Sequence, residues 1–224
     1  MHHADTHRGC RDQPADGGTL TEFRELLDRR WELAQQAGPA AAAELHDLDA
    51  RILARFERRV APLVLDIAGF TRLTAQWGVI HYLSLIRRMV TLCRPVVEGC
   101  EGTVVKCEAD NLFAHFPSVD RALEAALSIQ STLDRANFAT PEEFDIHVSI
   151  GIGYGPVLVL DHDMWGHEFN LAAKLGEDIA GSREILLTAA AYSALTSGGD
   201  RFEEFPVTLG GNPYNVYRLG AICG

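Results

Sequence analysis

Residues 61–67, with the sequence APLVLDI, form a short apolar run that decides the fold class. Its length and branched side chains predict a buried strand, with Asp66 near the end. A long helical stretch follows and stops at Gly99 and Gly102. Its apolar residues share one face: Tyr82, Ile86, Met89, Val90, Cys93 and Val97. The chain therefore begins this region with a β-α unit.

Beyond the glycines, GTVVKCE (102–108) and LFAHF (112–116) are strand-like runs joined by Ala-Asp-Asn, which is a hairpin signal. Ser118 can cap the helix that follows. Residues 146–152 alternate as a half-buried strand does. The order β-α-β-β-α-β is the ferredoxin-like split unit, so we expect an α+β fold with a ferredoxin-like core.

The rest of the chain predicts extra strands and helices around that core. They are a strand (PVLVL, 156–160), a helix (FNLAAKLGEDIA, 169–180), a strand (EILLT, 184–188), a short helix (TAAAYSAL, 188–195) and a final strand (YNVYRL, 214–219).

An N-terminal helical pair precedes the core. Residues 1–18 have almost nothing to bury and predict a disordered tail. A capping box at Thr19 predicts a helix start, and apolar residues then share one face: Leu20, Phe23, Leu27 and Trp31. Gly38-Pro39 breaks this helix, and a second one carries a stripe of Leu45, Leu48, Ile52 and Phe56. We expect the extension (19–59) to pack on the main domain (60–224) or across a dimer.

Composition narrows the range of partners. The net charge of −11 argues against a nucleic-acid surface, because phosphate backbones are bound by excess Lys and Arg. No apolar run is long enough to span a bilayer, and the N-terminus lacks the apolar core of a signal peptide. We therefore expect a cytoplasmic protein without membrane or nucleic-acid partners. To bind a triphosphate, so acidic a chain needs metal ions.

Two aspartates are candidates for holding such ions. Asp66 ends the first strand and Asp110 lies at the hairpin tip, which are neighbouring places in a β-α-β-β unit. Paired carboxylates repel unless a cation lies between them, and their oxygens suit Mg²⁺ or Mn²⁺. The ordinary alternative makes each one a turn or cap residue. After Asp66, small residues around Gly69, Phe70 and Thr71 allow a tight turn into a helix whose free N–H groups can hold phosphate.

Three ordered motifs resemble class III adenylyl and guanylyl cyclase domains. They are DIAGFTRL (66–73), VVKCEADNLFAHF (104–116), and SIGIGYGPVL with DMWGHEFNLAAKL (149–158 and 163–175). The resemblance covers roughly residues 60–220. It implies a homodimer with active sites at the subunit interface, in which a nucleoside triphosphate is converted to a cyclic monophosphate.

The resemblance also assigns roles by position. Asp66 and Asp110 match the aspartates that bind two divalent metal ions, Mg²⁺ or Mn²⁺, with the carbonyl of Ile67 completing the set. Lys106 and Asp163 match the residues that read the base. In such dimers one subunit supplies the metals and the other supplies the base pocket.

Two residues of one helix complete the implied site. Asn170 matches the asparagine that orients the ribose. Lys174 stands where the family usually has an arginine, and it is expected to offset charge on the α-phosphate. In such dimers Asn170 comes from the subunit that supplies the base pocket.

The base-reading pair favours adenine. Adenine presents the N1 acceptor beside the N6 amino donor, which complements a Lys106 donor and an Asp163 acceptor. Guanine has the opposite polarity, whereas cytosine has the same polarity as adenine. ATP is thus the expected substrate, and a pyrimidine triphosphate is an alternative. For Lys106 and Asp163 the ordinary alternative is a solvated salt bridge.

Three departures from the family pattern bear on the rate of turnover. Lys174 and the missing C-terminal lysine favour a second alternative, a catalytically weak or inactive dimeric module that binds nucleotide. Lys174 lacks the bidentate fork of arginine. Ala109 replaces the glycine before the second aspartate. TLGGNPYNV (208–216) has no basic residue before Arg218, where many members place a triphosphate-binding lysine. A purely structural ferredoxin-like protein would explain none of the matched residues.

Overall fold

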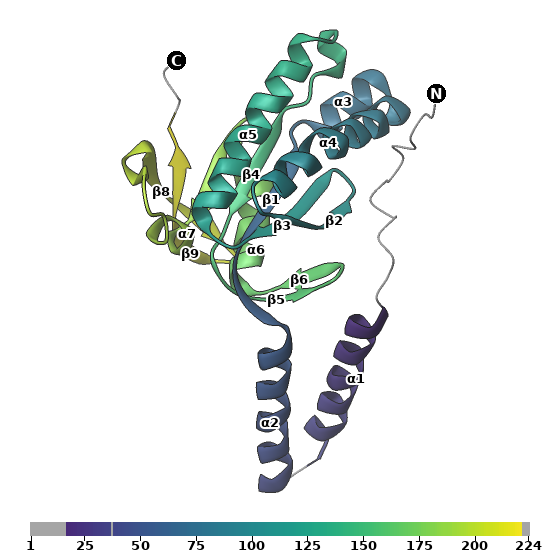
Figure 1. Ribbon diagram of the computed structural model, residues 1–224, viewed down its shortest axis with the longest axis vertical. Helices are drawn as coiled ribbons and strands as arrows, with labels where there is room; N and C mark the ends of the chain where they lie inside the picture. The colour runs from purple at the N-terminus through teal and green to yellow at the C-terminus, as the bar shows by residue number, and fades with distance from the viewer. Residues whose placement is uncertain (1–16, 37, 221–224) are drawn as a thin grey trace.

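The computed structural model describes residues 17–36 and 38–220 (Figure 1). The sheet has the strand order β2-β3-β1-β4-β7-β9-β8, with β5 and β6 pairing off this path. The order β2-β3-β1-β4 is that of a ferredoxin-like core, so the expected α+β fold is confirmed. The strands are β1 (Glu57–Ile67), β2 (Thr103–Glu108), β3 (Asn111–Phe116), β4 (Val148–Ile152), β5 (Gly155–Leu160), β6 (Asp163–Trp165), β7 (Ile185–Thr188), β8 (Phe202–Leu209) and β9 (Asn212–Leu219).

Strand β1 begins at Glu57, four residues before the predicted run, and it serves two partners in turn. Its first residues pair with β5, and residues 61–67 lie between β3 and β4. Leu63 and Leu65 belong to the larger core cluster, under α4 (Val79–Gly99) and α5 (Val119–Phe138). Val64 faces the other way, into the cluster that α6 (His167–Lys174) covers. Because side chains alternate along a strand, Asp66 points to the same face as Val64.

The predicted long helical stretch is two helices. α3 (Phe70–Trp77) ends at Gly78, whose φ of +84° is a left-handed value that favours glycine, and α4 then begins at Val79. The expected apolar face of α4 is confirmed in part, since Tyr82, Met89, Cys93 and Val97 are buried with Leu85, while Ile86 and Val90 are partly buried.

Glycines allow the helix α6 to lie very close to the centre of the sheet. The helix continues as a π-helix, η2 (Leu175–Ile179). A Cβ on Gly151 of β4 would lie 2.1 Å from the carbonyl oxygen of Ala172, and one on Gly176 would lie 2.7 Å from the carbonyl oxygen of Val64. Only glycine fits at both positions, so η2 is pressed against β1 and β4.

Helix α1 (Gly17–Ala34) differs from the prediction at its start and on its buried face. Thr19 is not the N-cap, because the helix already includes Gly17. Phe23 and Leu33 are buried, but Leu27 and Trp31 are 41% and 68% exposed. The predicted stripe is confirmed at Phe23 and, partly buried, at Leu20, but it was wrong at Leu27 and Trp31, because α1 turns a different side toward α2 (Pro39–Phe56). Of the stretch 1–18, predicted as a disordered tail, residues 1–16 lie outside the described residues, and the prediction was wrong for 17–18, which belong to α1.

Helix α2 confirms its predicted stripe, with Leu48, Ile52 and Phe56 buried and Leu45 partly buried. It leads directly into β1, and the helical pair projects from the main body of the protein (Figure 1). Phe23 joins the pair to the β5–β6 hairpin by stacking on Trp165, with ring centroids 5.5 Å apart. The division of the chain into an N-terminal extension (19–59) and a main domain (60–224) stays a prediction.

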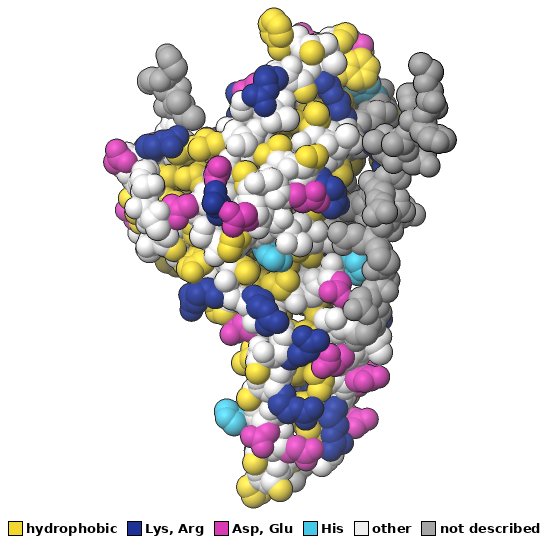
Figure 2. Space-filling model, in the orientation of Figure 1, with side chains coloured by type: hydrophobic (Ala, Val, Ile, Leu, Met, Phe, Trp, Pro, Cys, Tyr) yellow, Lys and Arg dark blue, Asp and Glu magenta, His cyan; other side chains and the backbone are white. Residues whose placement is uncertain are grey.

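Two strands were not predicted. β6 is only three residues long, and β8 pairs with β9 as a hairpin where a single final strand was expected. The helix α7 (Ala189–Ser193) and the short turns η1 (Glu142–Phe144) and η3 (Gly199–Arg201) complete the chain. Positive and negative side chains mix over the helical pair (Figure 2), where Arg29 pairs with Glu44 and Arg30 with Asp49. Every helix in the described ranges is too short or too polar to serve as a membrane span.

Candidate active site

The structure brings the two predicted metal-binding aspartates together. Asp66 is the penultimate residue of β1, and Asp110 lies in the turn between β2 and β3. Since β1 and β3 pair with Leu65 opposite Leu112, the turn is carried to the end of β1. The carboxyl groups of Asp66 and Asp110 lie within hydrogen-bonding reach of each other.

This proximity changes the acidity of the pair. Burial first, and then the charge of Asp110, raise the pKa of Asp66 to about 7. Glu177 of η2 adds a smaller contribution of the same sign, and its own pKa is raised by burial and by Asp178. Three acids therefore share one region, in which the charge of Lys174 opposes the rise in the pKa of Glu177. Such an oxygen-rich pair fits a divalent cation of the Mg²⁺ or Mn²⁺ type.

The pair does not form a complete metal cage. Within residues 17–36 and 38–220, no group of three or more His, Cys, Asp or Glu side chains is arranged to hold a metal ion. The main-chain carbonyl of Ile67 and the oxygens of a bound phosphate are the donors that remain. This incomplete set is typical of Mg²⁺ sites, which use one or two carboxylates together with substrate phosphates and water.

Two side chains that the sequence did not single out for the site hold these carboxylates. The hydroxyl of Tyr82 on α4 donates to Oδ2 of Asp110 at 2.8 Å. The amide of Asn111, oriented to satisfy its neighbours, donates to Oδ1 of Asp66 at 3.2 Å and to the carbonyl of Leu65 at 3.3 Å. For Tyr82 a signal was present, because a tyrosine on a buried helix face needs a partner for its hydroxyl.

The turn beside Ala109 and the turn after Asp66 differ in backbone strain. Ala109 has a φ of +52°, a left-handed value that costs a residue with a Cβ about 1 kcal/mol. Gly69 has a φ of +92° and begins α3 without a side-chain cap. The first N–H groups of α3 therefore have no capping side chain, as a phosphate-binding turn requires. The side chains of Phe70 and Thr71 lie outside what the structure describes.

Lys106 of β2 and Asp163 at the start of β6 lie together. Nζ of Lys106 is 3.0 Å from Oδ1 of Asp163 and 3.0 Å from Glu108, and it lies over the ring of Phe113. Burial acts to lower the pKa of Lys106, but the two carboxylates outweigh it and raise that pKa. The main-chain N–H of Met164 donates to Asp163 at 2.9 Å and fixes its carboxylate.

Asn170 and Lys174 lie one turn apart on the exposed side of α6. Nζ of Lys174 pairs with Oδ2 of Asp178 at 2.7 Å. Across the described part of the chain, neither side chain hydrogen-bonds to Asp66 or Asp110. The structure of a single chain thus presents two separate groups, the carboxylate pair at the end of β1 and the polar face of α6.

Comparisons with known proteins agree with this arrangement. The family model for the adenylate and guanylate cyclase catalytic domain matches residues 54–217. Adenylate cyclase from Streptomyces coelicolor (strain ATCC BAA-471 / A3(2) / M145) is 27% identical over 171 residues, which are 76% of this chain and 42% of that protein. A relative from Rhizobium meliloti (strain 1021) is 30% identical over 118 residues, or 53% of this chain and 20% of that protein. The chain thus spans less than half the length of both relatives.

Solved structures show the same fold. A crystal structure of an adenylate/guanylate cyclase/hydrolase from Silicibacter pomeroyi matches with a TM-score of 0.60 and 26% identity, covering 74% of this chain and 98% of that one. The guanylyl cyclase Cya2 matches with a TM-score of 0.63 at 16% identity, covering 75% and 94%, and supports the fold alone. The matched family model covers most of the chain, and the chain belongs to the adenylate and guanylate cyclase catalytic domain family.

Proposed function

We propose that this chain converts a nucleoside triphosphate, most readily ATP, to the 3′,5′-cyclic monophosphate and pyrophosphate, and that it does so as a homodimer. The observation that carries the proposal is the contact between Asp66 and Asp110, two acids from distant segments that meet at the end of the central strand. The names of the relatives, which include an adenylate cyclase, support the choice of reaction.

In the proposed reaction the ribose 3′-oxygen attacks the α-phosphorus and loses its proton, while the bond from that phosphorus to the β-phosphate oxygen breaks. Asp66, Asp110 and the carbonyl of Ile67 would hold two divalent ions. Bound there, such ions supply acidity for the 3′-hydroxyl and positive charge for the phosphates. The open N–H groups at the start of α3 are suited to phosphate oxygens.

The remaining residues position the nucleotide. Lys106 donates and Asp163 accepts, a polarity that complements adenine and opposes guanine. The exposed faces of Asn170 and Lys174 are free to meet a nucleotide that a second subunit holds on its carboxylate pair. Asn170 would align the 3′-oxygen. Lys174 would leave Asp178 to offset charge on the α-phosphate.

A second candidate function rests on Lys174. Its ammonium is engaged by Asp178 and lacks the planar fork that suits a phosphoryl group. A chain with this residue could bind nucleotide without turnover and act as a dimeric nucleotide-binding module. A pyrimidine cyclase is a further variant of the first candidate, because cytosine has the same hydrogen-bond polarity as adenine.

One experiment separates these candidates. Purified protein is incubated separately with ATP, GTP, CTP and UTP in the presence of Mn²⁺, and the products are identified by mass. We expect cyclic AMP as the main product, and Asp66→Ala or Asp110→Ala should reduce its formation by about 100-fold or more while the protein stays folded. Nucleotide binding without any cyclic product would support the module, and turnover near the parent rate in both variants would refute the metal assignment.

A further inference from the structure

Tyr82 occupies an unusual place for a polar group. Its side chain is among the largest of the fully buried ones, at 1% exposure, and it belongs to the core cluster between α4 and the sheet. Its hydroxyl nevertheless reaches Oδ2 of Asp110 at 2.8 Å, 28 positions away in the sequence. A buried phenol must find a hydrogen-bond partner, and here a partner is one of the two acids of the candidate site.

The packing of the core restricts the position of the Tyr82 hydroxyl. The ring belongs to a core cluster of α4 and the sheet that also contains Leu85 and Leu112, which are fully buried. Protein cores are close-packed, so the ring has little freedom to follow a movement of the β2–β3 turn. Asp110 itself is half-buried in that turn, where a carboxylate would otherwise choose among several rotamers.

Asp110 also experiences repulsion. The neighbouring carboxylate of Asp66 lies within hydrogen-bonding reach, so two like charges would drive Asp110 outward once both are ionised. The hydrogen bond from the hydroxyl of Tyr82 to Oδ2 of Asp110 limits that movement. The hydroxyl of Tyr82 remains a donor, because burial and the charge of Asp110 raise its pKa well above the usual range.

We infer that Tyr82 is a positioning residue that holds the carboxylate of Asp110 against Asp66, so that the pair binds divalent cations in a prepared geometry. The inference rests on the proposed function, because it assigns the cations to these two acids. Tyr82 acts through Asp110 and does not itself touch the substrate. Partners of this kind orient metal-binding carboxylates, and their loss weakens metal affinity by about 10–100-fold.

The alternative is that Tyr82 only fills the core, with a hydroxyl that happens to be satisfied. The two cases differ in what Tyr82→Phe does. Phenylalanine keeps the ring and its packing, and it removes only the donor to Asp110. A core-filling role predicts a small change in stability and none in metal binding, whereas a positioning role predicts a specific loss of cation affinity.

The test uses the full chain and Mn²⁺ alone as the probe, with free Mn²⁺ followed by electron paramagnetic resonance. We expect Tyr82→Phe to raise the Kd for Mn²⁺ by about 10-fold or more. Tyr192→Phe is the matched control, because its hydroxyl donates to the carbonyl of Gly199 at 3.2 Å, in contact with neither carboxylate. This control should bind Mn²⁺ as the parent does, and the midpoint of thermal unfolding reports the fold of each variant.

The outcomes separate the inference from the proposed function. If the parent binds no Mn²⁺, the metal assignment fails together with the inference. If the parent binds Mn²⁺ through Asp66 and Asp110 while folded Tyr82→Phe binds it within twofold of the parent, the inference alone is overturned.

A measurement on the unsubstituted chain covers the case in which Tyr82→Phe does not fold. The five tyrosines are replaced by 3-fluorotyrosine and followed by fluorine NMR, with signals assigned by Tyr→Phe variants at the other four positions. We expect low Mn²⁺ concentrations to broaden the Tyr82 signal first. A Tyr82 signal that broadens no earlier than the signals of the other four tyrosines would overturn the inference.

Discussion

At the scale of single residues, the position of Asp66 suits the proposed metal binding but destabilises the folded chain when no metal is bound. Burial and Asp110 hold its pKa near 7, so the carboxylate is forced to ionise in an unfavourable place at neutral pH. Acids whose pKa is raised in the folded state destabilise it as the pH rises through the folded value. We therefore expect the metal-free chain to lose stability between about pH 4 and pH 7 through this one group.

Replacing Asp66 with asparagine tests this conflict. Asn is neutral at every pH, so Asp66→Asn should raise the free energy of unfolding at pH 8 by about 2 kcal/mol, after a discount for partial exposure. At pH 4 the parent acid is already protonated, and the two proteins should be equally stable. Urea denaturation in a metal chelator at both pH values measures the difference. An equal effect at the two pH values would show that charge is not its cause.

The same scale shows how far the sequence could locate the site. Asp66, Asp110, Lys106 and Asp163 were named from their positions in the motifs, and the structure places each pair in contact. Sequence reasoning did not find the roles of Tyr82, Asn111 and Glu177. The approach of Tyr82 and Glu177 to the acids depends on how α4 and η2 pack on the sheet, and spacing along the chain carries no record of that packing. Asn111 reaches Asp66 across the pairing of β3 with β1.

At the scale of elements, predictions were confirmed where local sequence signals alone determine the element. The hairpin β2–β3 and the cap of α5 at Ser118 follow their sequence signals. The predicted buried face of α1 was wrong at Leu27 and Trp31, because the apolar residues of this helix extend around more than one face. Packing against α2 and β6 decides which side is buried. β8 was missed because FEEFPVTL mixes charges with Pro206, which is typical of an edge strand and weak as a strand signal.

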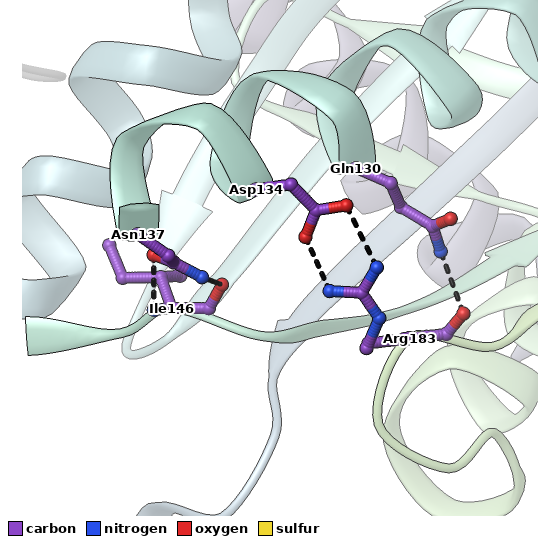
Figure 3. A network of polar contacts seen from close by, with 5 residues as sticks. All are labelled: Gln130, Asp134, Asn137, Ile146 and Arg183. Carbon is purple, nitrogen blue, oxygen red and sulfur yellow. Dashed lines mark hydrogen bonds and ion pairs between the residues drawn. The ribbon is translucent and has the colours of Figure 1, made fainter. Parts of the chain in front are cut away.

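The side chain of Asn137 joins helix α5 to the segment that leads into strand β4. Figure 3 shows the side chain of Asn137 facing Ile146, where it binds both the N–H and the carbonyl of the main chain. The side chain of Asn137 donates to the carbonyl of Ile146 at 3.0 Å and accepts from its N–H at 2.9 Å. Asn137 and Ile146 are both buried, so the N–H and carbonyl of Ile146 would have no water to replace the side chain of Asn137.

Asn137→Ala should therefore lower the free energy of unfolding by about 2–3 kcal/mol, because it leaves two buried main-chain groups unpaired. The matched control is Asp134→Asn, one turn away on α5, which weakens the exposed ion pair with Arg183 (Figure 3). Exposed pairs contribute under about 1 kcal/mol, so this control should change little. Chemical denaturation of both variants measures the two values, and the reverse order would contradict this account of the contact.

At the scale of the whole molecule, the residues of the proposed site form two separate groups within a single chain. The carboxylate pair lies at the end of β1, and Asn170 and Lys174 lie on an exposed face of α6. A net charge of −11 adds a need for cations before a triphosphate can approach. The sequence could name both groups through the resemblance, but the surface that would join two copies in the proposed dimer depends on side chains from several elements and is not encoded in any one motif.

The central claim is that one copy supplies the carboxylates and another supplies the face of α6. Mixing Asp66→Ala with Asn170→Ala tests it, because a mixed dimer contains one site with both defects and one site with neither. Each variant alone should be nearly inactive, and an equimolar mixture should recover roughly a quarter of the parent activity if subunits exchange at random. A mixture that stays inactive, although mass spectrometry shows mixed dimers, would contradict the claim.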